Sequence, residues 1–148
     1  MEIEKKYLVK DLPNLSHYPV SEISQFYLSF DPEIRLRQKN DQYFITQKSE
    51  GTDVREEIET EINENAFNIL RALIKSKAIK KTRYFIAISD NLTAELDVYH
   101  DDLDGLFTVE VEFETKEEME KFVAPTWFGE DISSNFKYKN KNLVKKLV

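Results

Sequence analysis

The chain has 148 residues, of which 41% are hydrophobic and 33% charged, and a formal net charge of −7 at pH 7; we therefore expect a single globular domain over residues 1–148, large enough for a hydrophobic core. The acidic balance argues against nucleic acid as a partner, and the lack of cysteine excludes disulfides and thiolate chemistry. No apolar run approaches membrane-spanning length and the charged start is unlike a signal peptide, so we expect no membrane association and a cytoplasmic protein.

Alternating apolar and polar residues predict strands in the first part of the chain. The expected strands are 1–9, 23–30, 33–38, 42–48 and 54–62. Asp31-Pro32 and residues 39–41 supply the turns between them. Asn63 then has the character of a helix N-cap. It precedes a predicted helix over 64–76 whose core stripe is Phe67, Leu70 and Ile74, widened by Ile69 and Leu73.

The second part of the chain continues with strands and ends in a tail. We expect strands over 78–89, 92–100 and 106–114. Thr115 and Glu118 form a capping-box pattern for a short helix over 116–123, which residues 125–129 break. The tail, 132–148, has weak helical character and ends in a basic amphipathic stretch. The sequence therefore predicts a mainly β (α+β) fold: a closed eight-stranded antiparallel β-barrel with a few flanking helices and a C-terminal helix, wide enough inside for one small ligand.

Charged residues recur at every second position on most of these strands. Residues two apart share one face of a strand. A solvated outer face is the usual explanation for such a pattern. Two observations argue against a solvated face here. The intervening residues are strongly apolar, and the charged faces contain almost no Ser, Asn or Gln. An inward surface of carboxylates and cations suits a polyanion bound together with a divalent metal.

These charge motifs also occur in a recognisable order along the chain. The order is Glu2-x-Glu4-x-Lys6, Arg35-x-Arg37, Thr46-x-Lys48, Arg55-x-Glu57-x-Glu59, Lys81-x-Arg83-Tyr84, Glu95-Leu96-Asp97, Gly105-Leu106 before Glu110-Val111-Glu112-Phe113, and Tyr138-Lys139-Asn140 before Asn142-Leu143. Over essentially the whole chain, the series resembles the CYTH superfamily, also called triphosphate tunnel metalloenzymes. The resemblance implies an eight-stranded tunnel that acts on triphosphate-bearing substrates with a divalent metal.

The residue chemistry agrees with this resemblance. Arg and Lys bind phosphate oxygens, while carboxylates bind Mg²⁺ or Mn²⁺. The expected substrate-binding residues are Lys6, Arg35, Arg37, Lys48, Arg55, Lys81, Arg83 and Lys139. The expected metal ligands are Glu2, Glu4, Glu110, Glu112 and Asp97. The expected catalytic residues are Glu57, Glu59 and Lys6, with either glutamate accepting the proton of the attacking water or holding a second metal.

The sequence thus predicts a metal-dependent hydrolase that cleaves the terminal phosphoanhydride of a short triphosphate. Inorganic tripolyphosphate is favoured because no insertion is evident that would grip a base or a thiazolium group. Thiamine triphosphatase, nucleoside triphosphatase, adenylate cyclase and a non-catalytic polyphosphate- or nucleotide-binding module remain alternatives. We expect a monomer or homodimer. The tail is either a solvated basic end or a lid in which Tyr138 and Asn140 dock at one mouth and Lys137 or Lys139 adds charge near the substrate.

Overall fold

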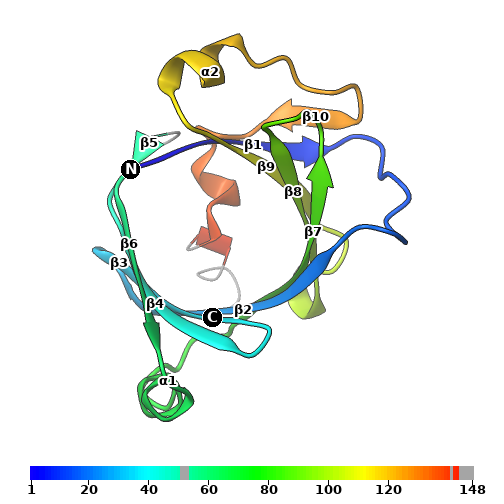
Figure 1. The fold of residues 1–148 in the computed structure, drawn as a ribbon. Helices are drawn as coiled ribbons and strands as arrows, with labels where there is room; N and C mark the ends of the chain where they lie inside the picture. The colour runs from blue at the N-terminus through cyan, green and yellow to red at the C-terminus, as the bar shows by residue number, and fades with distance from the viewer. Residues whose placement is uncertain (51–53, 141, 144–148) are drawn as a thin grey trace.

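The computed structural model describes residues 1–50, 54–140 and 142–143, and its strands surround a central space (Figure 1). The strands form one antiparallel sheet in the order β10-β1-β9-β8-β7-β2-β3-β4-β6, and β5 pairs with β1. Their bounds are β1 Glu2–Val9, β2 Val20–Phe30, β3 Glu33–Lys39, β4 Gln42–Lys48, β5 Val54–Arg55, β6 Glu57–Ile62, β7 Ile79–Ala87, β8 Thr93–Tyr99, β9 Phe107–Phe113 and β10 Phe128–Asp131. The predicted mainly β barrel is therefore confirmed.

The strand count differs from the predicted eight for two reasons. The expected strand over 54–62 divides at Glu56 into β5, which pairs with β1, and β6, which pairs with β4. This division brings the two ends of the sheet together. The second reason is β10, which begins inside the segment predicted as a break at residues 125–129 and pairs with β1. Gly129 allows this close approach, because a Cβ there would lie 3.0 Å from the Leu8 carbonyl oxygen.

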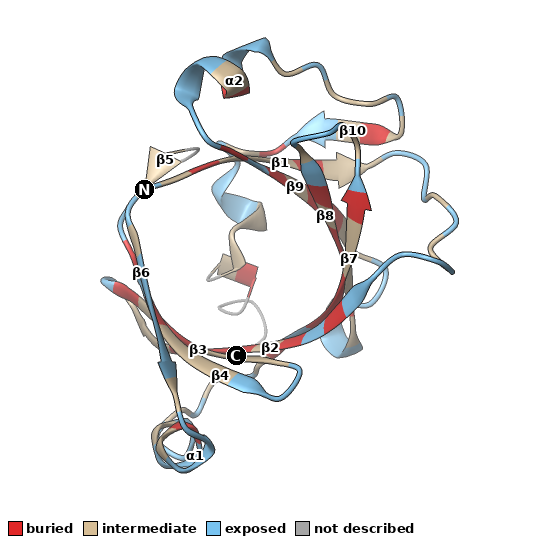
Figure 2. Ribbon diagram, viewed as in Figure 1, coloured by how far each residue is buried: buried red, intermediate tan, exposed pale blue. Residues whose placement is uncertain are grey.

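The barrel carries its main hydrophobic core on the outside of its wall. Ile3, Leu96, Val109 and Val111 belong to one buried cluster, and they alternate with charged residues that face the interior. Helix α2 (Lys116–Lys121) and β10 cover this cluster with Met119 and other apolar side chains. Buried stretches along β8 and β9 are visible as red segments in Figure 2. Apolar residues thus pack outward while the charged faces line the lumen.

A second layer is formed by helix α1 (Glu64–Arg71), which packs against the wall formed by β3 and β4. Asn63 caps it as predicted, since its side chain accepts a hydrogen bond from the Ala66 amide at 2.8 Å. The helix ends five residues earlier than expected. The amides of Leu73 and Ile74 bond three residues back instead, which tightens the last turn and returns Ile74 to the buried cluster.

The predicted apolar stripe of α1 is only partly correct. Phe67, Leu70 and Ile74 pack against the barrel. Ile69 and Leu73, expected to widen the stripe, are 68% and 70% exposed. The helix therefore packs along a narrower line of side chains than predicted.

Seen along the barrel in Figure 1, the described part of the C-terminal segment overlaps the space inside the ring of strands, and it contacts Lys6, Gln25 and Tyr99 of the wall. A 3₁₀ helix, η2 (Phe136–Tyr138), is followed by turns in which the amides of Asn142 and Leu143 donate to the Lys139 carbonyl. Leu143 is buried with Tyr27 and Tyr99. The rest of the predicted basic stretch, residues 141 and 144–148, lies outside the described residues. A second short turn, η1 (Asp101–Leu103), connects β8 to β9. Within the described part of the chain, no helix has the length and apolar character needed to cross a membrane.

Candidate functional site

The interior of the barrel is a charged cavity of about 290 Å³. Because alternate residues of a strand point to opposite faces, the expected site residues of β1, β3, β7 and β9 point into this cavity. The sequence-predicted residues that line it are Glu2, Glu4, Lys6, Arg35, Arg37, Lys48, Arg55, Glu57, Glu59, Lys81, Arg83, Glu110, Glu112 and Lys139. Among the described residues, nine lysines and arginines and eight glutamates line the cavity, so this part of its walls is nearly neutral.

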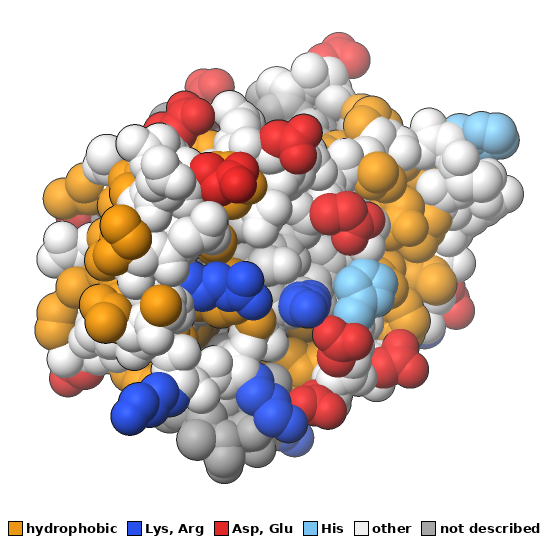
Figure 3. All heavy atoms as spheres, turned by 90° about the horizontal axis from the view of Figure 1, so that it is seen from below, with side chains coloured by type: hydrophobic (Ala, Val, Ile, Leu, Met, Phe, Trp, Pro, Cys, Tyr) orange, Lys and Arg blue, Asp and Glu red, His pale blue; other side chains and the backbone are white. Residues whose placement is uncertain are grey.

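The acidic excess of the chain consequently lies away from the cavity. The whole sequence carries seven more acidic than basic residues. On the outer face shown in Figure 3, acidic side chains are scattered among apolar and basic ones. The cavity is therefore more positive than the surface around it, which favours the entry of an anion.

Carboxylates from the first and last long strands meet inside the cavity. The β1–β9 register places Glu4 opposite Glu112 and Lys6 opposite Glu110. Burial, together with the nearby charge of Glu110, raises the pKa of Glu4 to about 8. Burial alone would raise the pKa of Glu110 as well, but Lys6, Arg83 and Lys81 hold it well below its usual range. The Lys6 ammonium lies 4.0 Å from the Glu110 carboxylate.

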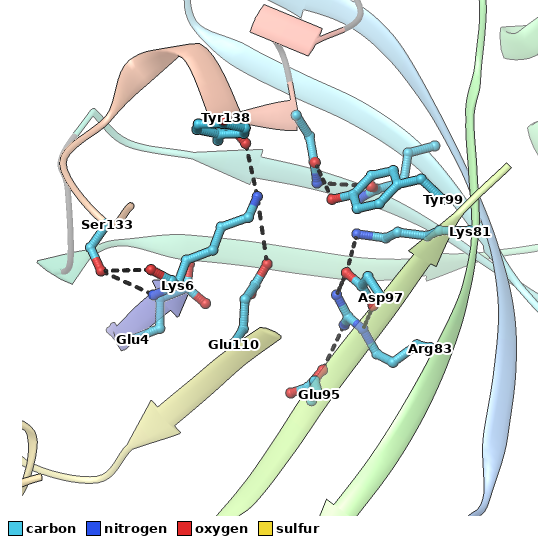
Figure 4. A network of polar contacts seen from close by, with 12 residues as sticks. Glu4, Lys6, Lys81, Arg83, Glu95, Asp97, Tyr99, Glu110, Ser133 and Tyr138 are labelled. Atoms are coloured by element: carbon cyan, nitrogen blue, oxygen red, sulfur yellow. Dashed lines mark hydrogen bonds and ion pairs between the residues drawn. The ribbon is translucent and has the colours of Figure 1, made fainter. Parts of the chain in front are cut away.

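The cations of β7 share one buried carboxylate beneath the cavity wall (Figure 4). Asp97 accepts from Arg83 at 2.8 and 3.0 Å and lies 2.8 Å from the Lys81 ammonium. Its side chain is fully buried and it does not line the cavity. Asp97 was expected to be a metal ligand, which stays a prediction; in the structure both of its oxygens contact cations. Its geometry fits a residue that holds Lys81 and Arg83 in place.

The arginines and lysine on the other side of the lumen bridge several carboxylates. Arg55 lies 3.3 Å from Glu4 and 3.8 Å from Glu2, and Lys48 lies 2.9 Å from Glu2. Arg35 contacts both Glu33 and Glu57, at 3.8 and 3.7 Å. The contacts of Arg35 and Arg55, at 3.3 to 3.8 Å, are long enough for either arginine to exchange them for a phosphate oxygen without moving far.

Three of the arginines that line the cavity have a buried N–H group that donates no hydrogen bond to a described residue. The Nε–H groups of Arg35, Arg37 and Arg55 are buried and have no hydrogen-bond partner among the described residues. A buried donor without an acceptor costs free energy, so such a group indicates a water or ligand oxygen that belongs beside it. All three side chains line the cavity. The site is thus arranged to receive an anion that has several acceptor oxygens.

The tail completes one side of the site, as Figure 4 shows for Lys6, Ser133 and Tyr138. The Lys6 ammonium donates to the Tyr138 carbonyl at 2.9 Å, and the Lys6 amide donates to the Ser133 hydroxyl at 3.0 Å. Asn140 accepts from the Tyr99 hydroxyl at 2.9 Å and donates to Gln25 at 3.2 Å. The Lys139 side chain lines the cavity, in keeping with the lid hypothesis.

Sequence reasoning missed several residues that line the cavity. Glu33 and Lys39 continue the period-two series of Arg35 and Arg37 in both directions, so an extension of that pattern would have found them. Phe85 continues the series of Lys81 and Arg83 in the same way. The remaining lining residues that were not proposed as site residues are Gln25, Tyr27, Glu95, Ser133 and Asn140.

The donor set fits a hard divalent cation that is completed by its substrate. Among the described residues, no three His, Cys, Asp or Glu side chains form a ready metal shell. Mg²⁺ usually takes one or two carboxylates and fills its other positions with water and phosphate oxygens. Glu4 lies beside Glu110, and burial together with the charge of Glu110 raises the pKa of Glu4, so a cation bound there would favour the charged form of this carboxylate pair. The residues present therefore fit Mg²⁺ or Mn²⁺.

Comparison with known proteins agrees with this geometry. A family model described as the CYTH domain matches residues 1–148. The inorganic triphosphatase of Nitrosomonas europaea is 39% identical over 145 residues, covering 96% of this chain and 95% of that protein. The inorganic triphosphatase of Acetivibrio thermocellus is 33% identical over 148 residues, covering 97% and 93%.

Solved structures give the same result for the fold. The crystal structure of an inorganic triphosphatase aligns with a TM-score of 0.72 and 36% identity over 97% of this chain and 94% of that chain. A putative adenylate cyclase of Bacillus halodurans aligns at a TM-score of 0.56 and 16% identity, which shows a shared fold alone. By family model and by sequence identity over nearly its full length, the chain belongs to the CYTH domain family.

Proposed function

We propose that this chain hydrolyses inorganic tripolyphosphate to pyrophosphate and orthophosphate. The observation that carries the proposal is the lumen itself, where buried arginine Nε–H groups without partners face a cavity that also holds a carboxylate cluster. Tripolyphosphate supplies acceptor oxygens along its whole length. Two relatives that match over more than 90% of their length are inorganic triphosphatases.

In this proposal Glu2, Glu4, Glu110 and Glu112 hold Mg²⁺ or Mn²⁺. The metal, when bound, would neutralise the developing charge on the phosphate oxygens. Glu110 is already charged, because nearby cations keep its pKa well below its usual range. Glu4 has to lose its proton to act as a ligand, and a cation beside it would lower its raised pKa again.

The chain's own side chains bind and orient the phosphates. Arg37 of β3 and Arg83 of β7 are charge-assisted donors from strands that flank β2. Lys6 is positioned by the Tyr138 carbonyl to neutralise an oxygen near the reacting phosphoryl group. Glu59 is a better candidate than Glu57 to accept the proton of the attacking water, because its side chain is 37% exposed and that of Glu57 is 20% exposed.

The cavity walls favour a substrate that consists of phosphate alone. Tyr27 and Phe85 are the aromatic side chains among the described lining residues, and almost all the others are charged or polar. A thiazolium group or a purine base would therefore find little apolar surface. Cleavage of thiamine triphosphate or a nucleoside triphosphate, and cyclisation of ATP, remain lesser alternatives. A non-catalytic binding module would have no need of the complete carboxylate set found here.

The proposal is tested by phosphate release from tripolyphosphate, pyrophosphate, ATP and thiamine triphosphate with Mg²⁺ and with Mn²⁺. We expect tripolyphosphate to be the best substrate and a chelator to stop turnover. Glu4→Gln should lower kcat at least about 100-fold while the protein stays folded, since an amide keeps the size of the side chain but removes the charge that a hard cation needs.

A matched control for this variant is Glu120→Gln on the outer surface, which should keep full activity. Full turnover by Glu4→Gln, or by the wild type in chelator, would contradict the role of metal. A wild-type protein that binds tripolyphosphate and releases no phosphate would leave the binding module as the function. Cytoplasmic location, single-domain organisation and the monomeric or homodimeric state stay predictions.

A further inference from the structure

We propose that a second pocket, on the outer face of the barrel, binds a nucleoside monophosphate. This outer pocket has a volume of about 340 Å³ and lies where the end of α1 and residues 72–78 meet the start of β7 and η1. A cavity of this size is in the range that holds a small-molecule ligand. The site is separate from the proposed triphosphatase function and does not depend on it.

The outer pocket and the tunnel lie on opposite faces of the same strands. Phe26 lines the outer pocket, while its neighbours Gln25 and Tyr27 line the tunnel. Lys80 lines the outer pocket and Lys81 the tunnel in the same way, because alternate residues of a strand point to opposite faces. One sheet therefore separates the two cavities, and both can be occupied together.

Two contacts bring distant segments of the chain together around the outer pocket. The Lys77 ammonium lies 2.9 Å from the Asp102 carboxylate, which joins the connection after α1 to η1. The His100 amide donates to the Lys80 carbonyl at 2.9 Å, which fixes the start of η1 beside β7. The walls of the pocket are thus held by the chain's own contacts.

Two cations of the outer pocket have no acidic partner. Arg71 and Lys80 line it, and neither has a carboxylate within 4.0 Å among the described residues. The Arg71 guanidinium lies 4.9 Å from the centre of the Phe26 ring, which restrains it without pairing it with an anion. Unpaired guanidinium and ammonium groups in one pocket favour a phosphate group as the ligand.

A hydroxyl group in the same pocket also lacks a partner. Ser76 lines the pocket, and its Oγ is buried with no hydrogen-bond partner in the part of the chain that the structure describes. Such a group costs free energy unless a water or ligand oxygen lies beside it. Rotation of the side chain toward the pocket would let it donate to a phosphate oxygen.

The apolar part of the lining indicates a ligand larger than an inorganic anion. Phe26 is buried, and Ile74 and Leu103 are half-buried, whereas the two unpaired cations are exposed. The apolar side chains therefore lie deeper in the pocket than the cations. A planar base fits against them and beside Arg71, because a guanidinium stacks on aromatic rings as well as binding phosphate. Orthophosphate alone would leave this apolar surface in water.

The outer pocket also offers acceptors for the hydroxyl groups of a ribose. Asp101 lines it and has no cation within 4.0 Å among the described residues. His100 supplies a second acceptor. Its Nε2 lies 2.7 Å from the Thr82 hydroxyl, whose one proton is donated to the Glu22 carboxylate at 2.9 Å. Nε2 therefore donates to Thr82, which leaves Nδ1 of the neutral ring as the acceptor. A carboxylate that accepts from ribose hydroxyls recurs in nucleotide sites.

Isothermal titration calorimetry of the whole protein with AMP, adenosine and orthophosphate tests the site, with and without tripolyphosphate in chelator. We expect a single AMP to bind under both conditions, at least about tenfold more tightly than adenosine or orthophosphate. Arg71→Ala should weaken AMP binding at least about tenfold, because a charged hydrogen bond is lost. Lys116→Ala removes an equal charge from α2, which lies across the barrel from α1 in Figure 1, and should leave AMP binding unchanged.

A second variant tests the ribose contact without disturbing the backbone. Asp101 has a φ of 56°, and asparagine tolerates this left-handed conformation. Asp101→Asn should weaken AMP binding about fivefold and leave binding of the 2′,3′-dideoxy analogue unchanged, because the analogue has no ribose hydroxyl to donate. Equal weakening of both compounds would contradict the ribose contact.

Four other outcomes would overturn the inference. Orthophosphate that binds as tightly as AMP would show a plain anion site. Displacement of AMP by tripolyphosphate, or loss of AMP binding in Arg37→Ala, would place AMP in the tunnel. Equal weakening by Arg71→Ala and Lys116→Ala would show non-specific attraction of charge, and a lack of AMP binding at millimolar concentration would refute the pocket. Phosphate release from tripolyphosphate is measured separately, and its failure would refute the triphosphatase function alone.

Discussion

Asp97 is the residue that holds two cations of the cavity, Lys81 and Arg83, in place. It is fully buried and gives one oxygen to Arg83 Nε and the other to both Arg83 and Lys81. Arg83 also contacts Glu95 at 2.7 Å. Burial lowers the pKa of Lys81 to about 7 despite the neighbouring Asp97. The carboxylate therefore keeps two adjacent cations oriented, and it helps Lys81 remain charged.

Asp97→Asn should weaken substrate binding more than it slows chemistry. The amide keeps the volume but leaves two buried cations without their shared counter-charge. We expect the KM for tripolyphosphate to rise about tenfold with a smaller change in kcat, and the free energy of unfolding to fall by on the order of 3 kcal/mol. Steady-state kinetics and urea denaturation measure the two effects.

The Lys81→Met change in the Asp97→Asn background separates a loss of orientation from a general loss of structure. Removing one of the two stranded cations should restore part of the stability, so the two substitutions should be strongly non-additive. Additive losses of stability would show that Asp97 does not act through Lys81.

At the scale of elements, the tail is held by polar contacts that reach across the lumen. Asn140 connects Tyr99 of β8 with Gln25 of β2, and Lys6 of β1 holds the Tyr138 carbonyl. Leu143 adds an apolar anchor among buried aromatic rings. Together these contacts place Lys139 on the cavity wall. This supports the lid hypothesis over a solvated end for the described part of the tail.

Asn140→Ala should loosen the tail and leave the barrel intact. The substitution removes two hydrogen bonds of 2.9 and 3.2 Å. We expect local stability to fall by about 1–2 kcal/mol, seen as faster hydrogen exchange of the amides in 135–143. The KM for tripolyphosphate should rise, because Lys139 is no longer fixed.

Asn91→Ala is a suitable control, since Asn91 also donates through its side chain, at 3.3 Å to Glu118, but lies on an outer hairpin. Unchanged exchange and KM in Asn140→Ala would mean that the tail has no part in the site.

For the whole molecule, the burial of many carboxylates in one lumen lowers the stability of the folded state. Burial comes first among the causes that raise the pKa of Glu4, Glu2 and Glu112, followed for Glu4 and Glu112 by neighbouring glutamates. A carboxyl whose pKa is higher in the folded state binds more protons there than in the unfolded chain. Its contribution to stability is therefore lost as the pH rises toward the folded-state pKa. Binding of a cation would relieve this cost.

The metal-free protein should accordingly become less stable between pH 5 and pH 7. For Glu4, whose pKa is raised to about 8, the loss is at most about 1.4 kcal/mol per pH unit. Above pH 7 the lowered pKa of Lys81 acts in the opposite direction, because the folded state then binds fewer protons than the unfolded chain. Urea denaturation in chelator at each pH measures the slope.

Glu4→Gln should flatten this slope, whereas Glu120→Gln on the surface should leave it as in the wild type. Stability that rises from pH 5 to pH 7 in the metal-free wild type would contradict the proposed balance of charges. Added Mg²⁺ should restore stability most at the higher pH, where the carboxylates are free of protons.

The sequence by itself determined the architecture and most of the cavity. Period-two charge on β1, β3, β7 and β9 was enough to predict an inward polar face, because a strand sends alternate residues to opposite sides. Asn63 and Thr115 marked the helix starts through local hydrogen bonds that do not depend on the rest of the fold. Such features are encoded by neighbours in the chain.

The tertiary structure alone decided which residues meet. Asp97 has the same period-two position as Glu95, yet it is buried beneath Arg83 while Glu95 faces the cavity. Strand β10 has no pattern of its own and exists because β1 offers it a partner. Lys39 and Phe85 come together across β2. These outcomes depend on register, shear and curvature, which are set by packing between segments far apart in the chain.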